Sequence, residues 1–319
     1  MRAIDLFCGC GGLSCGLERA GVEIIAAFDN WDDALAVYSD NFSHPVIKTT
    51  ISGDDLSPYM VRNPDLIVGG PPCQDFSSAG KRDESLGRAD LTLDFANIIA
   101  GVRPKWFIME NVERITKSWR YTRALEIYRT AGYGLTCITL DASFCGVPQA
   151  RKRHFVIGGL REPEDFLKEI LLKDQAKRPM SMRDYFGDEL DTEYVFRMPR
   201  NYNRRGVFSV DEPYPTVRGV NGPIPPGYSP RPNDATQDFT KVRALTTMER
   251  ARVQTFPKDF SFDSVKSKTK LEKMIGNAVP VELATYIARH LLEYERNGTN
   301  RFPVCTFAEP KQRSLDEYL

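Results

Sequence analysis

Residues 65–77 read DLIVGGPPCQDFS, an apolar run that stops at two glycines and two prolines. The run at 66–68 is typical of a short buried strand, and the turn that follows it is rigid. Such a turn holds Cys73 at the carboxyl edge of a sheet, where open α/β sheets bind their ligands. A thiol there can act as a nucleophile after it loses its proton. A small Cys packed beneath the turn is the alternative interpretation.

Short apolar runs alternate with helical patterns on both sides of this turn, over residues 1–160. Strands are expected at 3–7, 23–28, 66–68, 106–109, 135–140 and 153–158. Helices are expected at 12–20, 31–41, 91–100 and 124–130. This alternation predicts an α/β fold with a doubly wound, mostly parallel sheet that is covered by helices on both faces.

The composition changes after residue 160. A charged helical pattern at 162–174 leads into a segment rich in Pro, Gly, Tyr and Arg, where the prolines exclude long helices. Helical patterns return at 246–254 and 281–296. We therefore expect a large domain at 1–160, a smaller irregular domain at 161–242, and a C-terminal segment at 243–319 that returns to the first domain.

Charged residues make up 27% of the 319 residues and hydrophobic residues 41%, as in an ordinary soluble protein. No apolar run approaches the roughly 20 residues of a membrane span, and the N-terminus leaves no room for a signal peptide. Seven cysteines, an odd number, suit a reducing compartment. We expect a cytoplasmic monomer. The 43 basic and 43 acidic residues cancel, although a balanced total can hide a basic face.

Residues 5–13 read DLFCGCGGL, between the first expected strand and the first helix. Glycines at such a junction let the backbone approach a ligand. The third glycine of the dinucleotide fingerprint would fall on Ser14, so this is a different motif. Asp29, at the end of the second strand, is placed to bind ribose hydroxyls. A nucleoside cofactor without pyrophosphate fits both features, and S-adenosylmethionine is such a cofactor.

The cysteines of this motif do not predict a metal site. Cys8, Cys10 and Cys15 lack the paired spacing of zinc ligands, and the three histidines are scattered along the chain. We interpret the cysteines as small residues of a tight turn.

Two further motifs follow expected strands. Glu110 begins the sequence Glu-Asn-Val directly after the strand at 106–109, where a carboxylate can protonate or hydrogen-bond a ring nitrogen, although such an acid more often caps a helix. Residues 149–153 read QARKR, and strand alternation places Gln149, Arg151 and Arg153 on one face. Two converging arginines suit a carboxylate or a carbonyl oxygen.

In their order, these motifs resemble those of DNA (cytosine-5-)-methyltransferases of the bacterial or phage restriction-modification type. Residues 243–257 (RALTTMERARVQTFP) and 276–280 (GNAVP) extend the resemblance, which covers about residues 3–295. It is interrupted where the family keeps its variable target-recognition region, here 161–242. The sequence differs from the family's usual residues at Asn30, Thr50 and Thr255, where an aromatic residue, an Asp and a Gly are common.

The resemblance implies methylation of carbon 5 of a flipped-out cytosine in a specific double-stranded DNA sequence, with base flipping before the chemistry. It implies that the Cys73 thiolate adds to carbon 6 of the ring, that Glu110 holds ring nitrogen 3 and the exocyclic amine, and that Arg153 binds the ring carbonyl. Arg151 is implied to support the pocket or the thiolate.

The resemblance also implies the binding residues. The expected S-adenosylmethionine site consists of Phe7, Gly9, Gly11, Gly12, Asp29, Ile51, Pro72, Asn277 and Val279. The expected DNA contacts are Ser77, Lys81, Arg82, Arg197, Arg200, Arg204, Arg205 and Arg218. A cognate restriction endonuclease is a further functional partner that this family type suggests.

Three other functions compete with this interpretation. A tRNA cytosine-5 methyltransferase shares the domain, but the length of the segment 161–242 favours duplex DNA. A non-catalytic DNA-binding member would be expected to lack Cys73, Glu110 or Arg153, and all three are present. A Rossmann oxidoreductase is opposed by the missing glycine.

Overall fold

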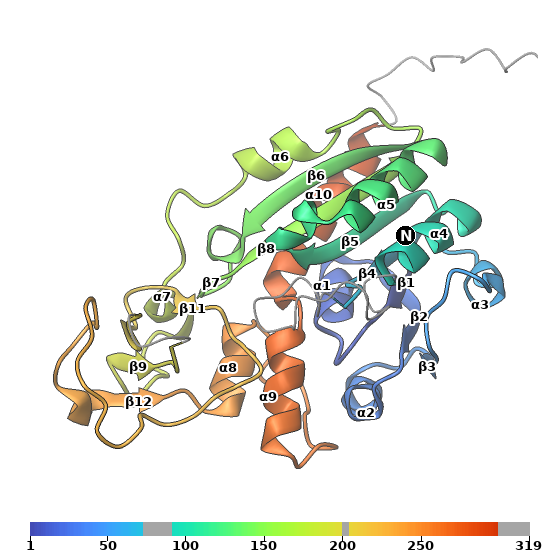
Figure 1. Cartoon of the computed structure of the whole chain (residues 1–319). Helices are drawn as coiled ribbons and strands as arrows, with labels where there is room; N and C mark the ends of the chain where they lie inside the picture. The colour runs from blue at the N-terminus through green and yellow to red at the C-terminus, as the bar shows by residue number, and fades with distance from the viewer. Residues whose placement is uncertain (73–90, 200–203, 299–319) are drawn as a thin grey trace, which may run out of the picture.

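The computed structural model describes residues 1–72, 91–199 and 204–298, and its centre is a seven-stranded sheet (Figure 1). The strand order is β3-β2-β1-β4-β5-β8-β6. The strands are β1 (Arg2–Leu6), β2 (Glu23–Asp29), β3 (Val46–Lys48), β4 (Leu66–Gly69), β5 (Trp106–Val112), β6 (Tyr133–Asp141) and β8 (Lys152–Leu160). β8 runs antiparallel to both of its neighbours, and the other pairs are parallel. The predicted mostly parallel α/β sheet is confirmed.

Helices cover both faces of this sheet because successive strand residues point to opposite sides. Phe107 joins one core with α3 (Ser57–Met60), α4 (Leu91–Val102) and α5 (Trp119–Thr130). Ile108, the next residue, joins the other core with α1 (Gly12–Ala20), α6 (Lys168–Lys173) and α10 (Val281–Gly298). α2 (Asp32–Asn41) lies beside β3 (Figure 1). Among the described residues, no helix is long and apolar enough to cross a membrane.

The C-terminal helix α10 lies against α1, at the opposite end of the chain. A Cβ added to Gly16 of α1 would lie 2.5 Å from the Cβ of Ala284 on α10, so only glycine permits this close approach. The Oγ1 of Thr285 also donates a hydrogen bond to the carbonyl of Gly16, at 3.0 Å. α10 therefore shares one core with α1.

The smaller elements gather at one end of the molecule (Figure 1). Strands β9 (Tyr194–Phe196), β10 (Val207–Ser209) and β12 (Val242–Ala244) form a three-stranded sheet. β7 (Gln149–Ala150) and β11 (Tyr214–Pro215) form a two-stranded parallel pair. The helices here are α7 (Met182–Phe186), α8 (Thr247–Val253) and α9 (Lys268–Asn277). One apolar cluster joins the small sheet to α8 and α9.

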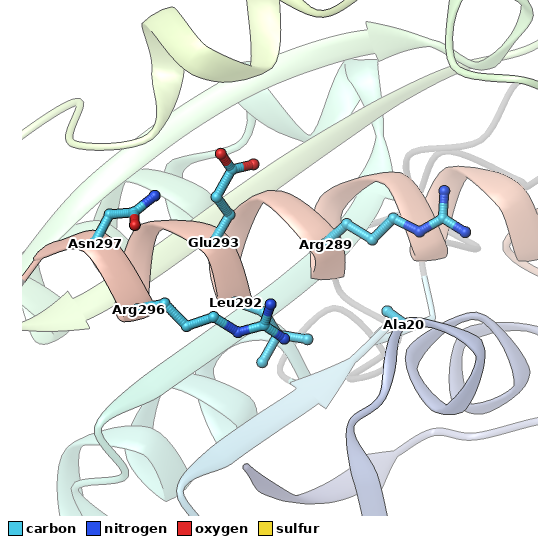
Figure 2. Close-up of a pocket in the computed structure, with 6 residues that line it drawn as sticks. All are labelled: Ala20, Arg289, Leu292, Glu293, Arg296 and Asn297. Carbon is cyan, nitrogen blue, oxygen red and sulfur yellow. The ribbon is translucent and has the colours of Figure 1, made fainter.

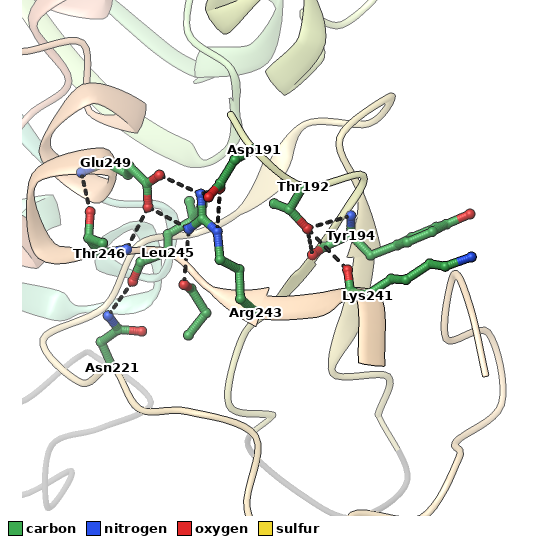
Figure 3. Close-up of polar contacts among 10 residues, drawn as sticks. Asp191, Thr192, Tyr194, Asn221, Lys241, Arg243, Leu245, Thr246 and Glu249 are labelled. Carbon is green, nitrogen blue, oxygen red and sulfur yellow. Dashed lines mark hydrogen bonds and ion pairs between the residues drawn. The ribbon is translucent and has the colours of Figure 1, made fainter. Parts of the chain in front are cut away.

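Polar contacts fasten the small sheet to α8 (Figure 3). Arg243 on β12 donates two hydrogen bonds to the carboxylate of Glu249, at 2.7 and 2.8 Å, and pairs with Asp191. Thr246 and Glu249 form a capping box at the start of α8. β12 thus pairs with β9 across the expected boundary at residue 242, so the recognition region and the C-terminal segment share one sheet.

Several elements differ from the sequence-based expectation. β3 and α3 lie outside the expected elements, and β5 continues past the expected end at residue 109 to Val112. The helix expected at 162–174 is confined to 168–173, because Pro163 and the positive φ of Asp165 (59°) break the earlier part. This helix packs in the same core as α10. The sequence pattern also does not predict α9, whose buried face is only Met274, Ile275 and their neighbours.

Candidate active site

The expected catalytic side chains lie where the parallel strands end. Because β8 is antiparallel, its first residues lie beside the carboxyl end of β5, and Arg153 is the register partner of Val112. The Arg153 Nε donates to the Glu110 Oε1 at 2.8 Å, and both side chains are largely buried. Strand topology therefore brings together two residues that are 43 positions apart in the sequence.

Glu110 lies against the turn that leads to Cys73. A Cβ added to Gly70 would lie 3.2 Å from the Glu110 Oε2, so the glycine leaves room for the carboxylate. Burial raises the pKa of Glu110 above its ordinary value, although the positive charges of Arg153 and Arg151 oppose this shift. A buried carboxyl group with a raised pKa can carry a proton closer to neutral pH than an exposed one.

Asn111 holds the same turn from the next position of β5. Its Nδ2 donates to the carbonyl of Pro71 at 3.1 Å, and its Oδ1 accepts from the amide of Val112 at 2.9 Å. Neighbouring strand residues face opposite ways. The Glu110 carboxylate therefore pairs with Arg153, whereas the Asn111 amide holds the turn. Cys73, which follows this turn, lies outside the described residues, as do Ser77, Lys81, Arg82 and Arg200.

Arg151 has different partners from Arg153. Its fully buried guanidinium donates to three backbone carbonyls, those of Val217 at 3.1 Å and of Gly276 and Ala278 at 3.0 Å. The two arginines expected on one face of a strand therefore separate: Arg153 pairs with the carboxylate, and Arg151 joins the end of the recognition region to the end of α9.

The loop after β1 follows a path that favours glycine. Phe7, Gly9 and Gly11 all have positive φ angles, of 62°, 55° and 94°. The carboxylate of Asp29 holds this loop, because it accepts from the amide of Gly9 at 2.8 Å and from the amides of Asn30 and Trp31 at 2.7 and 3.0 Å. Asp29 and the loop therefore form one unit at the ends of β1 and β2.

The glycines of this loop have different roles. Among the described residues, a Cβ on Gly9 would meet no atom within 4 Å, which leaves space for a ligand. A Cβ on Gly11 would collide with the Phe42 ring, and one on Gly12 would collide with the carbonyl of Val279. Gly11 and Gly12 are thus explained by packing.

The other expected cofactor residues surround the same edge. Pro72 is half-buried in the turn after β4, and Val279 is buried beside Gly12. Asn277 is exposed at the end of α9. Ile51 is buried in the core with Phe28 rather than open at the surface.

Asp5 lies directly beneath this loop in a buried polar chain. Its Oδ2 accepts from the Ser14 hydroxyl at 2.6 Å, which in turn accepts from the Tyr38 hydroxyl at 2.7 Å. Burial raises the pKa of Asp5 to about 7, and the charge of Asp29 adds to the shift.

Replacement of Asp5 by Asn should make stability less dependent on pH. Unfolded Asp has a pKa of 3.8 and folded Asp5 of about 7, so between these values only the unfolded state loses its proton. The stability of the parent should fall by up to about 4 kcal/mol as pH rises from 4 to above 7. Asp5→Asn should lack this decline, as measured by urea denaturation at several pH values. Parallel curves for parent and variant would contradict the assignment.

The expected DNA-contacting arginines are held to different degrees. Arg205 is committed to Glu212, with hydrogen bonds at 3.0 and 2.5 Å, and its guanidinium stacks 4.2 Å from the centre of the Phe208 ring. Arg197 donates to the carbonyl of Thr216 at 3.1 Å, and Arg218 donates to the carbonyl of Met198. The side chain of Arg204 is exposed.

The remaining candidate features do not add chemistry. Cys8 and Cys10 are buried, and burial raises the pKa of Cys10 to about 12, which opposes the thiolate form that metals bind. Within the described ranges, no group of three or more metal-binding side chains occurs. A hollow of about 440 Å³ lies along α10 (Figure 2). Glu295 on that helix bonds to Lys105 and Trp106 at the amino end of β5, so the hollow is remote from the carboxyl edge.

Three polar residues are absent from the expected set of site residues. They are Asn111, Gln149 and Gln254, all buried and hydrogen-bonded beside the site. Each lies inside one of the motifs described above, and that location is the feature of the sequence from which it could have been identified. What the motifs do not reveal is that these side chains bond to distant segments: Asn111 to the carbonyl of Pro71, and the two glutamines to each other and to backbone groups.

Comparisons with known proteins identify the family of this chain. A family model described as C-5 cytosine-specific DNA methylase matches residues 1–293. Type II methyltransferase M.HindV of Haemophilus influenzae is 53% identical over 299 residues, covering 93% of this chain and 98% of the relative. Type II methyltransferase M.HgiDI of Herpetosiphon aurantiacus is 52% identical, covering 92% and 95%.

Solved structures show the same fold at low sequence identity. The S. pombe Dnmt2 methyltransferase matches with a TM-score of 0.69 at 18% identity, covering 92% of this chain and 98% of that one. The family match spans both the edge with Glu110 and Arg153 and the loop held by Asp29. The chain belongs to the C-5 cytosine-specific DNA methylase family and is a DNA (cytosine-5-)-methyltransferase.

Proposed function

We propose that this enzyme methylates carbon 5 of a flipped-out cytosine in a specific double-stranded DNA sequence, with a transient covalent bond between Cys73 and carbon 6. The observation that carries the proposal is the buried Glu110–Arg153 pair beside the turn that leads to Cys73. A cytosine ring needs a nucleophile on carbon 6 because its carbon 5 is otherwise a poor nucleophile.

Glu110 and Arg153 hold the base in this scheme. Protonated Glu110 donates to ring nitrogen 3 as the Cys73 thiolate adds to carbon 6, which neutralises the charge that develops on the ring. Arg153 donates to the ring carbonyl while its Nε keeps the carboxyl group oriented. After methyl transfer, water acts as the base that takes the proton from carbon 5, and the electron pair of that bond expels the Cys73 thiolate. Ring nitrogen 3 returns its proton to Glu110, which restores the aromatic ring.

The loop after β1 fits an S-adenosylmethionine site. The open space at Gly9 admits a ligand, and the Asp29 carboxylate accepts three backbone hydrogen bonds, which leaves acceptor capacity for a ribose hydroxyl. When bound, the cofactor supplies an electrophilic methyl group. Phe7, Gly9, Pro72, Asn277 and Val279 would hold the cofactor at this edge of the sheet, and the buried Ile51 would support the site from the core.

Asp29→Ala should weaken cofactor binding. Loss of a charged hydrogen-bond acceptor costs about 1.5–3 kcal/mol, so the Kd for S-adenosylhomocysteine should rise by roughly 10- to 100-fold. Calorimetric titration of folded protein measures this directly. Asp29→Asn keeps one acceptor oxygen and should lie between parent and Ala, whereas an unchanged Kd in Asp29→Ala would refute the role.

Duplex DNA is the proposed substrate, because the two relatives are Type II methyltransferases. A restriction endonuclease of the same specificity is the proposed functional partner of a cytoplasmic, monomeric enzyme. Arg204, and the guanidinium groups of Arg197 and Arg218, are the recognition-region candidates for base or phosphate contacts.

Bisulfite sequencing tests the proposed function. Plasmid DNA incubated with the protein and S-adenosylmethionine should contain 5-methylcytosine within one recurring sequence. A reaction without S-adenosylmethionine is the control. Unmodified plasmid, or methylation without a common sequence, would contradict the proposal.

A further inference from the structure

A buried chain of hydrogen bonds links the end of the recognition region to the turn between α9 and α10. Gln149 and Gln254 are fully buried and bonded to each other, with the Gln149 Nε2 donating to the Gln254 Oε1 at 2.7 Å. The Gln149 Oε1 accepts from the amide of Val217 at 2.8 Å. The Gln254 Nε2 donates to the carbonyls of Ile275 at 2.6 Å and Ala278 at 3.0 Å.

The donors and acceptors of this hydrogen-bond chain can be arranged in only one way. The amide of Val217 can only donate, which fixes the orientation of Gln149. The orientation of Gln254 follows, because its oxygen must face the Gln149 amino group. Each glutamine is thus committed at both ends, and neither can be replaced without leaving buried backbone groups unpaired.

Each end of this hydrogen-bond chain reaches a backbone segment beside the candidate site. At one end, Val217 follows β11 in the recognition region, and Arg151 also holds its carbonyl. At the other end, Ala278 precedes Val279, whose carbonyl leaves no room for a side chain on Gly12 of the loop after β1. The two backbones also touch: a Cβ on Gly276 would lie 2.5 Å from the amide of Gly219. A displacement of either segment must therefore displace the other.

We propose that Gln149 and Gln254 are positioning residues that couple the recognition region to the cofactor loop, so that target DNA and cofactor each strengthen binding of the other. This inference rests on the proposed function. Coupling between two binding sites is reciprocal, so it can be measured from either side.

Binding of S-adenosylhomocysteine, with and without a duplex of the methylated sequence, tests the coupling. In the parent, the duplex should lower the Kd for S-adenosylhomocysteine by about fivefold or more. In Gln149→Met and Gln254→Met, which keep side-chain length but remove every hydrogen bond, this factor should fall to about one. The double variant should resemble the single variants, because both residues belong to one continuous chain of hydrogen bonds that either substitution breaks. A parent without coupling, or variants that retain it, would overturn the proposal.

Thr136→Val is the matched control. Thr136 is equally buried, and its hydroxyl accepts from the amide of Leu167 at 3.0 Å, away from the two glutamines. This variant should lose one buried hydrogen bond but keep the coupling factor of the parent. Loss of the factor in Thr136→Val would indicate general destabilisation and would overturn the assignment.

Hydrogen exchange on the parent keeps the test open if the variants do not fold. S-adenosylhomocysteine should slow amide exchange in the peptide that contains Val217. That residue lies at the end of the hydrogen-bond chain opposite to the cofactor loop. Unchanged exchange there would overturn the proposal. Exchange needs no DNA, so a failure of the coupling is distinguishable from a failure of DNA methylation, which the plasmid experiment detects.

Discussion

Cys73→Ser is expected to lose methyl transfer by about 10⁴-fold or more. A serine hydroxyl at this position does not ionise near neutral pH, so it cannot add to carbon 6 of the ring as a thiolate does. The turn before it stays tied to β5 through Asn111 and Pro71, so the change affects chemistry rather than placement. Transfer of labelled methyl groups to plasmid DNA measures the loss, and binding of S-adenosylhomocysteine should persist.

Cys137→Ser provides a matched control. Cys137 is a half-buried thiol on β6, outside the proposed site. The same atom exchange there should leave the methylation rate close to that of the parent. Equal rates in Cys73→Ser and the parent would refute the nucleophile.

Glu110→Gln is the second change with a large expected effect, a loss of about 10²- to 10⁴-fold in the rate of methylation. Glutamine fills the same space but cannot give a proton to ring nitrogen 3. Because burial raises the pKa of Glu110, the protonated form persists above the ordinary range of a carboxylic acid. The contribution of Glu110 should therefore decline as pH rises through its raised pKa, and the variant should lack that decline.

The control for this change lies three residues further along the chain. Glu113 is exposed at the start of the 3₁₀ turn after β5, and Glu113→Gln should keep the rate and the pH profile of the parent. Single-turnover rates over a range of pH distinguish the two variants. A parental profile in Glu110→Gln would remove the proton-donor role.

The long strands and the edge they form were predictable from the sequence, whereas the short strand β3 was not. Buried parallel strands appear as continuous apolar runs, and α1 spans 12–20 as expected because Gly21 ends it with a left-handed cap. Glu110 and Arg153 follow from the same patterns, although β5 continues to Val112, so Glu110 lies within the strand rather than directly after it. Their direct contact needed one further fact, that β8 runs antiparallel to β5.

The contacts between distant segments were not predictable. The separate partners of Arg151 and Arg153 depend on where residues 217 and 278 return in space. Thr255 stands where the family usually has Gly, and its φ of 61° explains that preference. Its hydroxyl donates to the Gln254 carbonyl at 2.7 Å and accepts from the Glu282 amide at 2.9 Å, contacts that a glycine cannot make.

Trapping on DNA that contains 5-fluorocytosine tests the central claim most directly. Fluorine at carbon 5 cannot leave as a proton does, so the covalent intermediate should accumulate after methyl transfer. We predict a stable protein–DNA complex whose modified peptide contains Cys73, and none in Cys73→Ser. If the same protein methylates ordinary DNA but forms no adduct, or forms one at another residue, the proposed mechanism is wrong.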